Sequence, residues 1–262
     1  MLGNPNRLVM NTAHLIPEAC VAAILLRSDE HPDLPFFGGT GFFVHFPPYG
    51  GVYFVTARHC VCSQSGTLKG KVEVKLNNDP NCNLAVPFSE QLTVLESDDS
   101  TEHEDIVVFT IGPLEETDRV KLLDRSLRLL EQNIADFILA TLVSARGKVR
   151  TVGYPGASKA IDYENNHATV QPRGIVGTVT TQSDDEKWCT VEELNWKDGG
   201  ISGFSGSPIL EFVPGTDGKL AARPIGVLLT GAKNEVFKFV NINLVTNLIS
   251  GWILKSGIST AA

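Results

Sequence analysis

Hydrophobic residues in this chain come mostly in short runs that are separated by glycine, proline, asparagine or aspartate. Runs of this kind, rich in β-branched and aromatic side chains, are typical of β-strands. The runs before residue 113 occupy residues 19–27, 39–46, 51–57, 71–77, 90–97 and 105–112. The later runs read "KVRTVGYP", "GIVGTVTTQ", "KWCTVEEL", "SPILEFV", "RPIGVLLTG" and "VFKFVNI". The pattern therefore predicts two strand-rich halves of similar size.

Two segments have a helical pattern instead. In residues 113–137 apolar side chains recur at every third or fourth position, and acidic residues cluster near the start, where the helix dipole favours them. The apolar residues are Val120, Leu122, Leu123, Leu127, Leu129, Leu130 and Ile134. Residues 243–257 have a similar amphipathic pattern, so we predict a helix in each segment.

Helices do not alternate with the strands, which argues against a parallel βαβ sheet and favours barrels or a sandwich. We expect an N-terminal extension (1–18), a first β-rich unit (19–112), a helical linker (113–137) and a second β-rich unit with the C-terminal helix (138–262). The chain has 262 residues, 42% of them hydrophobic, which suffices for one large domain or two small packed ones.

Charge and cysteine content narrow the range of partners. The formal net charge of -8 argues against nucleic acid, because binding to phosphates needs clustered lysine and arginine. No apolar run approaches the roughly 20 residues needed to cross a bilayer, and residues 1–18 lack the apolar centre of a signal peptide. The five cysteines cannot all pair. We therefore expect a cytoplasmic protein with no membrane partner and with reduced, mostly buried thiols.

The loop "GFSGSP" brackets Ser205 with Gly203 and Gly206. Glycines on both sides of a serine permit a tight turn whose N–H groups can point at one spot, as the oxyanion of acyl transfer requires. A Gly-x-Ser-x-Gly nucleophile elbow would need glycine where this chain has Ser207. The alternative is an ordinary Gly/Ser-rich hairpin loop.

His59 follows a predicted strand and is next to Cys60 and near Cys62, so it can be a structural histidine, a zinc ligand or a catalytic base. A zinc site needs two more ligands at suitable spacing, and Cys82 and Cys189 are isolated. We therefore expect no metal and no cofactor. A serine nucleophile needs a base, and that base needs a third group to orient it, so His59 is a candidate base for Ser205.

Asp105 is the candidate orienting carboxylate. It ends the acidic loop 96–105 and directly adjoins the predicted strand "DIVVFTI", which would hold it in place. Most of that loop is better explained as a solvated acidic surface. The alternative interpretation of Asp105 is that it too is a solvated acid of this loop.

Four motifs together resemble the chymotrypsin/trypsin-like serine proteases: "GTGFFV" (39–44), "TARHC" (56–60), "EDIVVF" and "GFSGSP". Their order, histidine, aspartate, serine, is the chymotrypsin order. "GYPG" (153–156) and the following "GIVGTVT" further resemble the bacterial-type trypsin-like peptidases, which need no zymogen activation. The resemblance covers roughly residues 19–255. It implies an all-β fold of two six-stranded antiparallel β-barrels with an inter-barrel helical segment and a C-terminal helix.

The resemblance also implies roles for individual residues. Ser205 would attack the scissile carbonyl, His59 would act as general base and then general acid, and Asp105 would fix the imidazole tautomer. The N–H groups of Gly203 and Ser205 would form the oxyanion hole. The implied function is that of a selective or regulated intracellular serine endopeptidase that acts on a protein or peptide substrate, with a regulatory protein as a further partner.

The substrate pocket is implied less directly. Residues about six before the serine point to Gly199, and Thr230 and Gly231 would face the substrate backbone. Glu235 would approach the base of the pocket, where an acid favours arginine or lysine in the substrate. A shift of one residue along a strand would reverse which side chains face inward.

The chain departs from the animal digestive enzymes at two positions. Phe204 stands where those enzymes have the aspartate that pairs with a newly cut N-terminus, so we expect no activation of that kind. Cys60 matches a family cysteine, but its usual partner has no counterpart in "PFFGGTGFFV", so we expect a free, buried thiol. Two other functions remain open: a catalytically silent interaction module with the protease fold, and an esterase that uses the same triad.

Overall fold

The computed structural model describes residues 17–257, apart from 31, 48–49, 77–85, 95–103, 157–158, 165–166, 182–187, 197–200, 215–219 and 233–235. Its first half is a curled antiparallel sheet with the strand order β4-β1-β2-β3-β6-β5. The strands are β1 (Val21–Arg27), β2 (Phe36–His45), β3 (Val52–Ala57), β4 (Lys71–Leu76), β5 (Phe88–Leu92) and β6 (Ile106–Ile111). Nearly every residue of β1, β3 and β6 is buried, because one face lines the sheet's own core and the other is covered.

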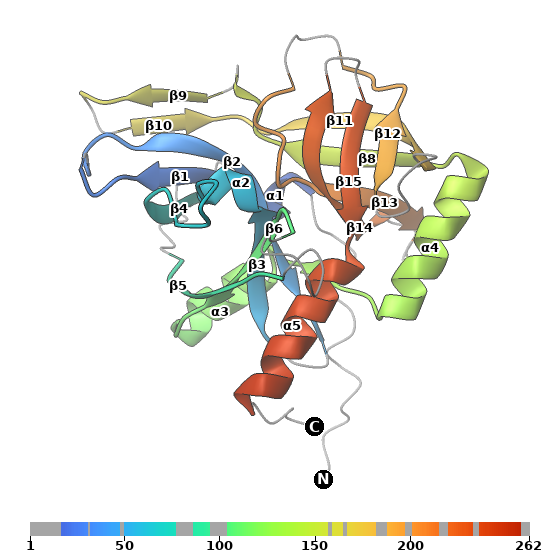
Figure 1. Ribbon diagram of the computed structural model, residues 1–262, viewed down its shortest axis with the longest axis horizontal. Helices are drawn as coiled ribbons and strands as arrows, with labels where there is room; N and C mark the ends of the chain where they lie inside the picture. Colours follow the sequence, from blue (N-terminus) through green and yellow to red (C-terminus); the bar gives the residue numbers. More distant parts are fainter. Residues whose placement is uncertain are drawn as a thin grey trace.

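The second half is a closed barrel with the strand order β11-β12-β15-β14-β13-β8 (Figure 1). Its strands are β8 (Lys148–Gly153), β11 (Arg173–Thr181), β12 (Cys189–Glu192), β13 (Pro208–Pro214), β14 (Leu220–Ala232) and β15 (Val236–Asn241). A separate hairpin, β9 (Lys159–Asp162) and β10 (His167–Val170), extends from the barrel toward the first sheet, where the Tyr163 hydroxyl donates to the Pro35 carbonyl (3.3 Å). The predicted all-β architecture of two β-barrel units is confirmed.

The segment between the halves differs from the single helix that we expected. It forms α3 (Glu116–Leu123), the short strand β7 (Leu127–Arg128) and α4 (Gln132–Ala145). The helix breaks because β7 pairs in parallel with the end of β2, and the Leu129 N–H donates to the His45 carbonyl (2.9 Å). Leucines at alternate positions 127 and 129 fit a strand as well as a helix, so the apolar pattern did not reveal the break.

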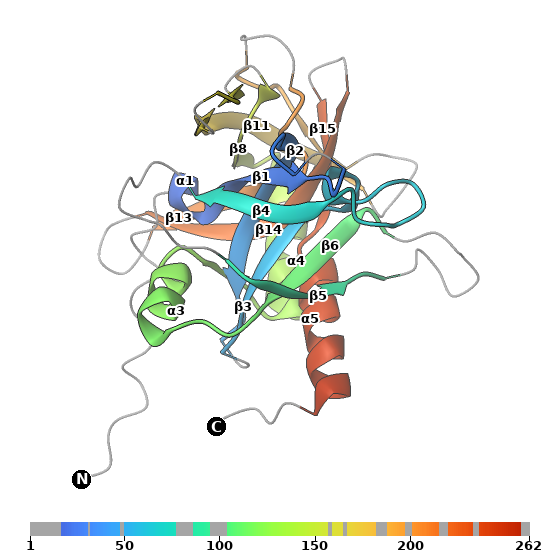
Figure 2. The same ribbon diagram turned by 90° about the vertical axis from the view of Figure 1, so that its left-hand side faces the viewer.

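The final helix, α5 (Asn243–Ser256), follows the last strand of the second barrel but packs against β5 and β6 of the first sheet (Figure 2). Ile249 is fully buried in the same apolar cluster as residues of the first sheet. Trp252 contacts the Tyr53 ring edge-on, with 6.2 Å between ring centres, and its Nε1–H donates to Glu90 Oε2 (2.9 Å). The helix therefore ties the two halves together. Among the described residues, no helix is both long and apolar enough to cross a membrane.

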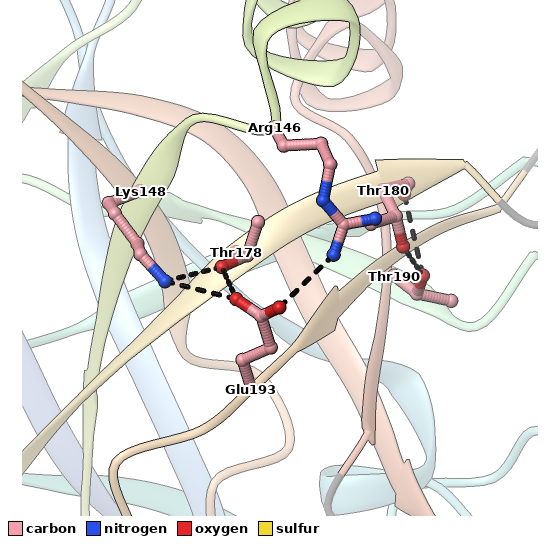
Figure 3. A network of polar contacts seen from close by, with 6 residues as sticks. All are labelled: Arg146, Lys148, Thr178, Thr180, Thr190 and Glu193. Carbon is pink, nitrogen blue, oxygen red and sulfur yellow. Dashed lines mark hydrogen bonds and ion pairs between the residues drawn. The ribbon is translucent and has the colours of Figure 1, made fainter.

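A polar network joins three strands on the outside of the second barrel (Figure 3). Glu193, just after β12, accepts hydrogen bonds from Thr178 of β11 (2.5 Å) and Lys148 of β8 (3.1 Å), and pairs with Arg146 (3.3 Å). The Thr178 hydroxyl and then Lys148 lower the pKa of Glu193 to about 2. The network links the ends of β8, β11 and β12 through their side chains.

Candidate active site

Strand pairing brings His59 and Asp105 together. His59 lies in the short helix α2 (Arg58–Val61), which follows β3 directly, and Asp105 lies just before β6. Because β3 and β6 pair with Ala57 opposite Ile106, the two residues meet at the same end of the sheet. The Arg58 N–H donates to the Asp105 carbonyl (3.1 Å), and the His59 N–H donates to Asp105 Oδ1 (2.9 Å).

The side chains of His59 and Asp105 form a close pair, with 2.6 Å between Nδ1 and Oδ2. The hydrogen bond to Asp105 is the main reason that the pKa of His59 lies above its usual 6.5, and burial opposes it. When Nδ1 carries the proton toward Asp105, Nε2 is left as a free acceptor. About half of the His59 side chain is exposed (50%). The pair has the arrangement of a general base and the group that orients it.

Ser205 lies in a tight turn that depends on two glycines. Gly203 has φ 97° and Gly206 has φ 85°, which other residues adopt only with strain. A Cβ on Gly206 would lie 2.1 Å from the Thr40 carbonyl oxygen, and one on Gly203 would lie 2.5 Å from the Tyr154 carbonyl oxygen. The turn is therefore packed too closely to accept a side chain at either position.

The turn is attached to both halves of the molecule. The Ser205 carbonyl accepts the Thr40 N–H of β2 (3.0 Å) and the Cys60 thiol (3.4 Å), and Cys60 is the neighbour of His59. On the other side, the Gly206 N–H donates to the Leu228 carbonyl of β14 (2.7 Å). Ser205 thus lies at the interface between the first sheet and the second barrel. Its carbonyl oxygen contacts Cys60, the residue that follows His59.

Thr40 positions the serine turn, although the sequence motifs did not identify it as a site residue. Its hydroxyl donates to the Gly203 carbonyl (2.7 Å) and accepts the Tyr154 N–H (2.9 Å), while its own carbonyl accepts the Thr56 hydroxyl (2.7 Å). One buried side chain thereby holds the serine turn against the first sheet. The only sign in the sequence is its place in "GTGFFV", within the strand that precedes the histidine.

The candidate groups make no direct hydrogen bond to one another within the described residues. Within the described residues no hydrogen bond joins the Ser205 hydroxyl to His59, and the N–H groups of Gly203 and Ser205 have no acceptor there. Unpaired N–H groups next to a serine can receive an oxyanion. Catalytic hydrogen bonds are often long in the absence of substrate and shorten when it binds.

The predicted pocket residues lie partly within the described chain. Thr230 and Gly231 belong to β14, where they pair with Lys238 and Phe237 of β15. β13 pairs with β14 as far as Val227, and Leu228 exchanges hydrogen bonds with Gly206 and Ser207, so from residue 229 onward this edge of β14 is free among the described strands. An extended peptide can pair with such an edge. Gly199 and Glu235 lie outside the described residues.

Two departures from the digestive enzymes have a structural explanation. Phe204 is buried and packs edge-on against Trp196 (5.6 Å between ring centres) and against Phe237 (5.9 Å), so it anchors the serine turn in the second barrel by apolar contact. Cys60 is a free, buried cysteine, as expected. A Cβ on Gly39 would lie only 2.4 Å from its sulfur, so the thiol packs against a glycine that has no room for a side chain.

Cys62 directly follows α2 and contacts β5. Its sulfur accepts a hydrogen bond from Gln91 Nε2 (3.5 Å), on β5. Within the described ranges, no three His, Cys, Asp or Glu side chains lie close enough together to hold a metal ion.

Comparison with known proteins places this geometry on an established fold. No protein-family model and no curated protein matches the sequence. Solved structures do match: the thermostable serine protease AL20 from an extremophilic microorganism has a TM-score of 0.56 at 13% identity, covering 89% of this chain and 97% of that one. The protease Anisep from Arthrobacter nicotinovorans has a TM-score of 0.54 at 12% identity, with coverage of 88% and 95%. HL collagenase has a TM-score of 0.55 at 15% identity, with coverage of 92% and 94%. The chain therefore has the two-barrel fold of the chymotrypsin-like serine proteases.

Proposed function

We propose that the protein is a serine endopeptidase in which Ser205, His59 and Asp105 form the catalytic triad. The observation that carries the proposal is the 2.6 Å hydrogen bond between His59 and Asp105, next to a serine turn that is hydrogen-bonded to Cys60, the neighbour of His59. A structural histidine needs neither an exposed Nε2 nor a glycine-flanked serine beside it. The fold of the neighbouring proteases supports the same chemistry.

In the proposed reaction, Ser205 Oγ attacks the scissile carbonyl carbon while His59 Nε2 takes its proton. Asp105 keeps the Nδ1 proton in place and stabilises the imidazolium that forms. The N–H groups of Gly203 and Ser205 bind the oxyanion, which is worth about 100- to 1,000-fold in rate for each donor. When the C–N bond breaks, His59 gives the proton to the leaving amine. Water then hydrolyses the acyl-enzyme by the reverse proton transfers.

The free edge of β14 is the proposed site for the substrate backbone before the scissile bond. Thr230 and Gly231 lie on this edge, and main-chain hydrogen bonds to them would align an extended peptide. Gly199 and Glu235 remain our candidates for the side-chain pocket, and Glu235 would give a trypsin-like preference for arginine or lysine. We further propose that the enzyme acts inside cells on a narrow set of substrates or under a protein regulator.

Covalent labelling with a fluorophosphonate tests the proposal directly. We expect the probe to modify Ser205 in the native protein, and expect no labelling of Ser205→Ala and very slow labelling of His59→Ala. Ser207→Ala is the matched control, because Ser207 is two residues away and its buried hydroxyl has no hydrogen-bond partner in the described chain. Labelling that fails in the native protein, or that persists in Ser205→Ala, contradicts the triad.

One observation favours a second candidate, a non-catalytic interaction module. The Ser205 hydroxyl and His59 are not hydrogen-bonded within the described residues, as in a protein that has kept the fold and lost the reaction. This candidate predicts no labelling and a biological activity that survives Ser205→Ala. An esterase with the same triad would be labelled but would hydrolyse small esters without cleaving peptides.

A further inference from the structure

Lys159 lies beside the serine turn without taking part in the proposed reaction. It is the first residue of β9, in the hairpin that extends from the second barrel. Its Nζ lies 5.3 Å from the centre of the Phe37 ring, on β2 of the first sheet. The same nitrogen would lie 3.0 Å from a Cβ on Gly203. The ammonium group therefore lies at the interface between the two halves, next to Gly203, whose N–H is a proposed oxyanion donor.

The charge of Lys159 has no counterion among the described residues. No hydrogen bond or ion pair is made by its ammonium group there, and the Phe37 ring is an aromatic contact that stabilises the charge. Burial lowers the pKa of Lys159 to about 8, while Cys60 opposes this shift. Burial of a cation without a nearby anion costs free energy. A site that holds an unpaired ammonium group is therefore suited to binding an anion.

The position of Lys159 indicates which part of a substrate it would meet. The segment before the scissile bond is proposed to follow the edge of β14, in the second barrel. The segment after the bond leaves from the other side of the carbonyl, where His59 delivers its proton. Lys159 lies on that side, because it contacts Phe37 of β2, and Gly39 of the same strand packs against Cys60, the neighbour of His59.

We propose that Lys159 is a specificity residue that binds a carboxylate of the substrate in the one or two positions after the scissile bond. The inference rests on the proposed function and adds the chemistry of the leaving segment: an aspartate or glutamate side chain there pairs with the ammonium group. The Phe37 ring and the bond from Tyr163 to the Pro35 carbonyl hold the hairpin so that the cation is preorganised.

The first test compares cleavage of a peptide library by three forms of the protein. The measured quantity is the ratio of acidic to amide residues, Asp and Glu against Asn and Gln, at the two positions after each cut, read by mass spectrometry. We expect a ratio of about three- to tenfold in the native protein, a ratio near one in Lys159→Met and a preference for basic residues in Lys159→Glu. Lys255→Met is the matched control, since Lys255 lies in the exposed last turn of α5, far from β9 in Figure 1, and should keep the native ratio.

The ratio should also fall as the pH rises through about 8, since Lys159 then loses its charge. A native ratio of one, or a ratio that is unchanged in Lys159→Met, overturns the proposal.

A second test separates this inference from the proposed function. In the Ser205→Ala variant, which cannot turn over substrate, the reaction of the Lys159 amine with acetic anhydride is followed by peptide mapping. A mixture of glutamate-containing peptides should slow acetylation of Lys159 several-fold. A matched mixture with glutamine in place of glutamate should not slow it. Acetylation of Lys255 should be the same with both mixtures. Equal protection by both mixtures, or none, counts against the Lys159 site. A failure of fluorophosphonate labelling counts against the triad alone.

Discussion

Gly39 lies directly against the sulfur of Cys60, so close that a Cβ on Gly39 would be 2.4 Å from it. We expect Gly39→Ala to lower the free energy of unfolding by about 1–3 kcal/mol, because the added methyl group overpacks this contact. Denaturant titration measures this change. Gly251→Ala in α5 is the control, since a Cβ at that position meets no other atom within 4 Å. An equal effect of the two substitutions would contradict the close packing of Gly39.

The pH dependence of the reaction should report the His59–Asp105 bond. His59 must be neutral to accept a proton, and Asp105 raises its pKa above 6.5, so the rise of kcat/KM with pH should have its midpoint above 6.5. In Asp105→Asn we expect this midpoint to move down and the rate to fall by orders of magnitude, since the tautomer is lost. A midpoint that does not move in Asp105→Asn contradicts the assignment.

The same pair affects stability with a definite sign. A histidine whose pKa is raised in the folded state stabilises the fold fully at pH values below its unfolded pKa, about 6.5. That contribution is lost as the pH rises through the higher folded pKa. Against Asp105→Asn, the native protein should therefore lose part of its stability advantage between pH 6 and alkaline pH, as thermal unfolding can measure.

Thr40 should matter for the reaction because its hydroxyl joins the Gly203 carbonyl to the Tyr154 N–H. Thr40→Val keeps the shape of the side chain but leaves both partners unsatisfied, which costs about 1–3 kcal/mol. We expect slower fluorophosphonate labelling of Ser205 together with lower stability. Thr40→Ser retains the hydroxyl and should restore most of the labelling rate. If valine and serine behave alike, the hydroxyl does not hold the turn.

The C-terminal helix offers a matched pair of substitutions. Ile249 of α5 is fully buried against the first sheet, and Leu254 of the same helix is 80% exposed. Ile249→Ala should lower the free energy of unfolding by about 2–5 kcal/mol, and Leu254→Ala should change it by less than about 0.5 kcal/mol. Chemical denaturation of both variants checks the packing of α5. Similar losses for the two would mean that this face of the helix is not the buried one.

Much of the fold could be predicted from local pattern. The short apolar runs predicted the strands of the first sheet and of the closed barrel, but not β7 or the hairpin β9–β10. The pattern of residues 243–257 predicted α5, because burial of one face imposes a period on the sequence. The break between α3 and α4 could not be read in this way. It depends on the pairing of Leu127 with Val44 of β2, a contact between distant parts of the chain.

The residues of the candidate site likewise differ in whether local sequence pattern could predict them. His59, Asp105 and Ser205 each stand out because an apolar strand or a pair of glycines adjoins them in the sequence. Thr40 and Lys159 do not, because their importance comes from the carbonyl of Gly203, the ring of Phe37 and other partners far away in the chain. Contacts of this kind arise from tertiary packing, so the local sequence around each residue does not indicate them.

The packing of α5 onto the first sheet has a consequence for biosynthesis. The first half of the chain leaves the ribosome early, but the apolar surface around Tyr53 is covered by Trp252, which follows both barrels in the sequence. The contact between Tyr53 and Trp252 therefore forms only after the second half has been made. The interface between His59 and Ser205 also forms late, so the proposed active site assembles only once both halves of the chain are present.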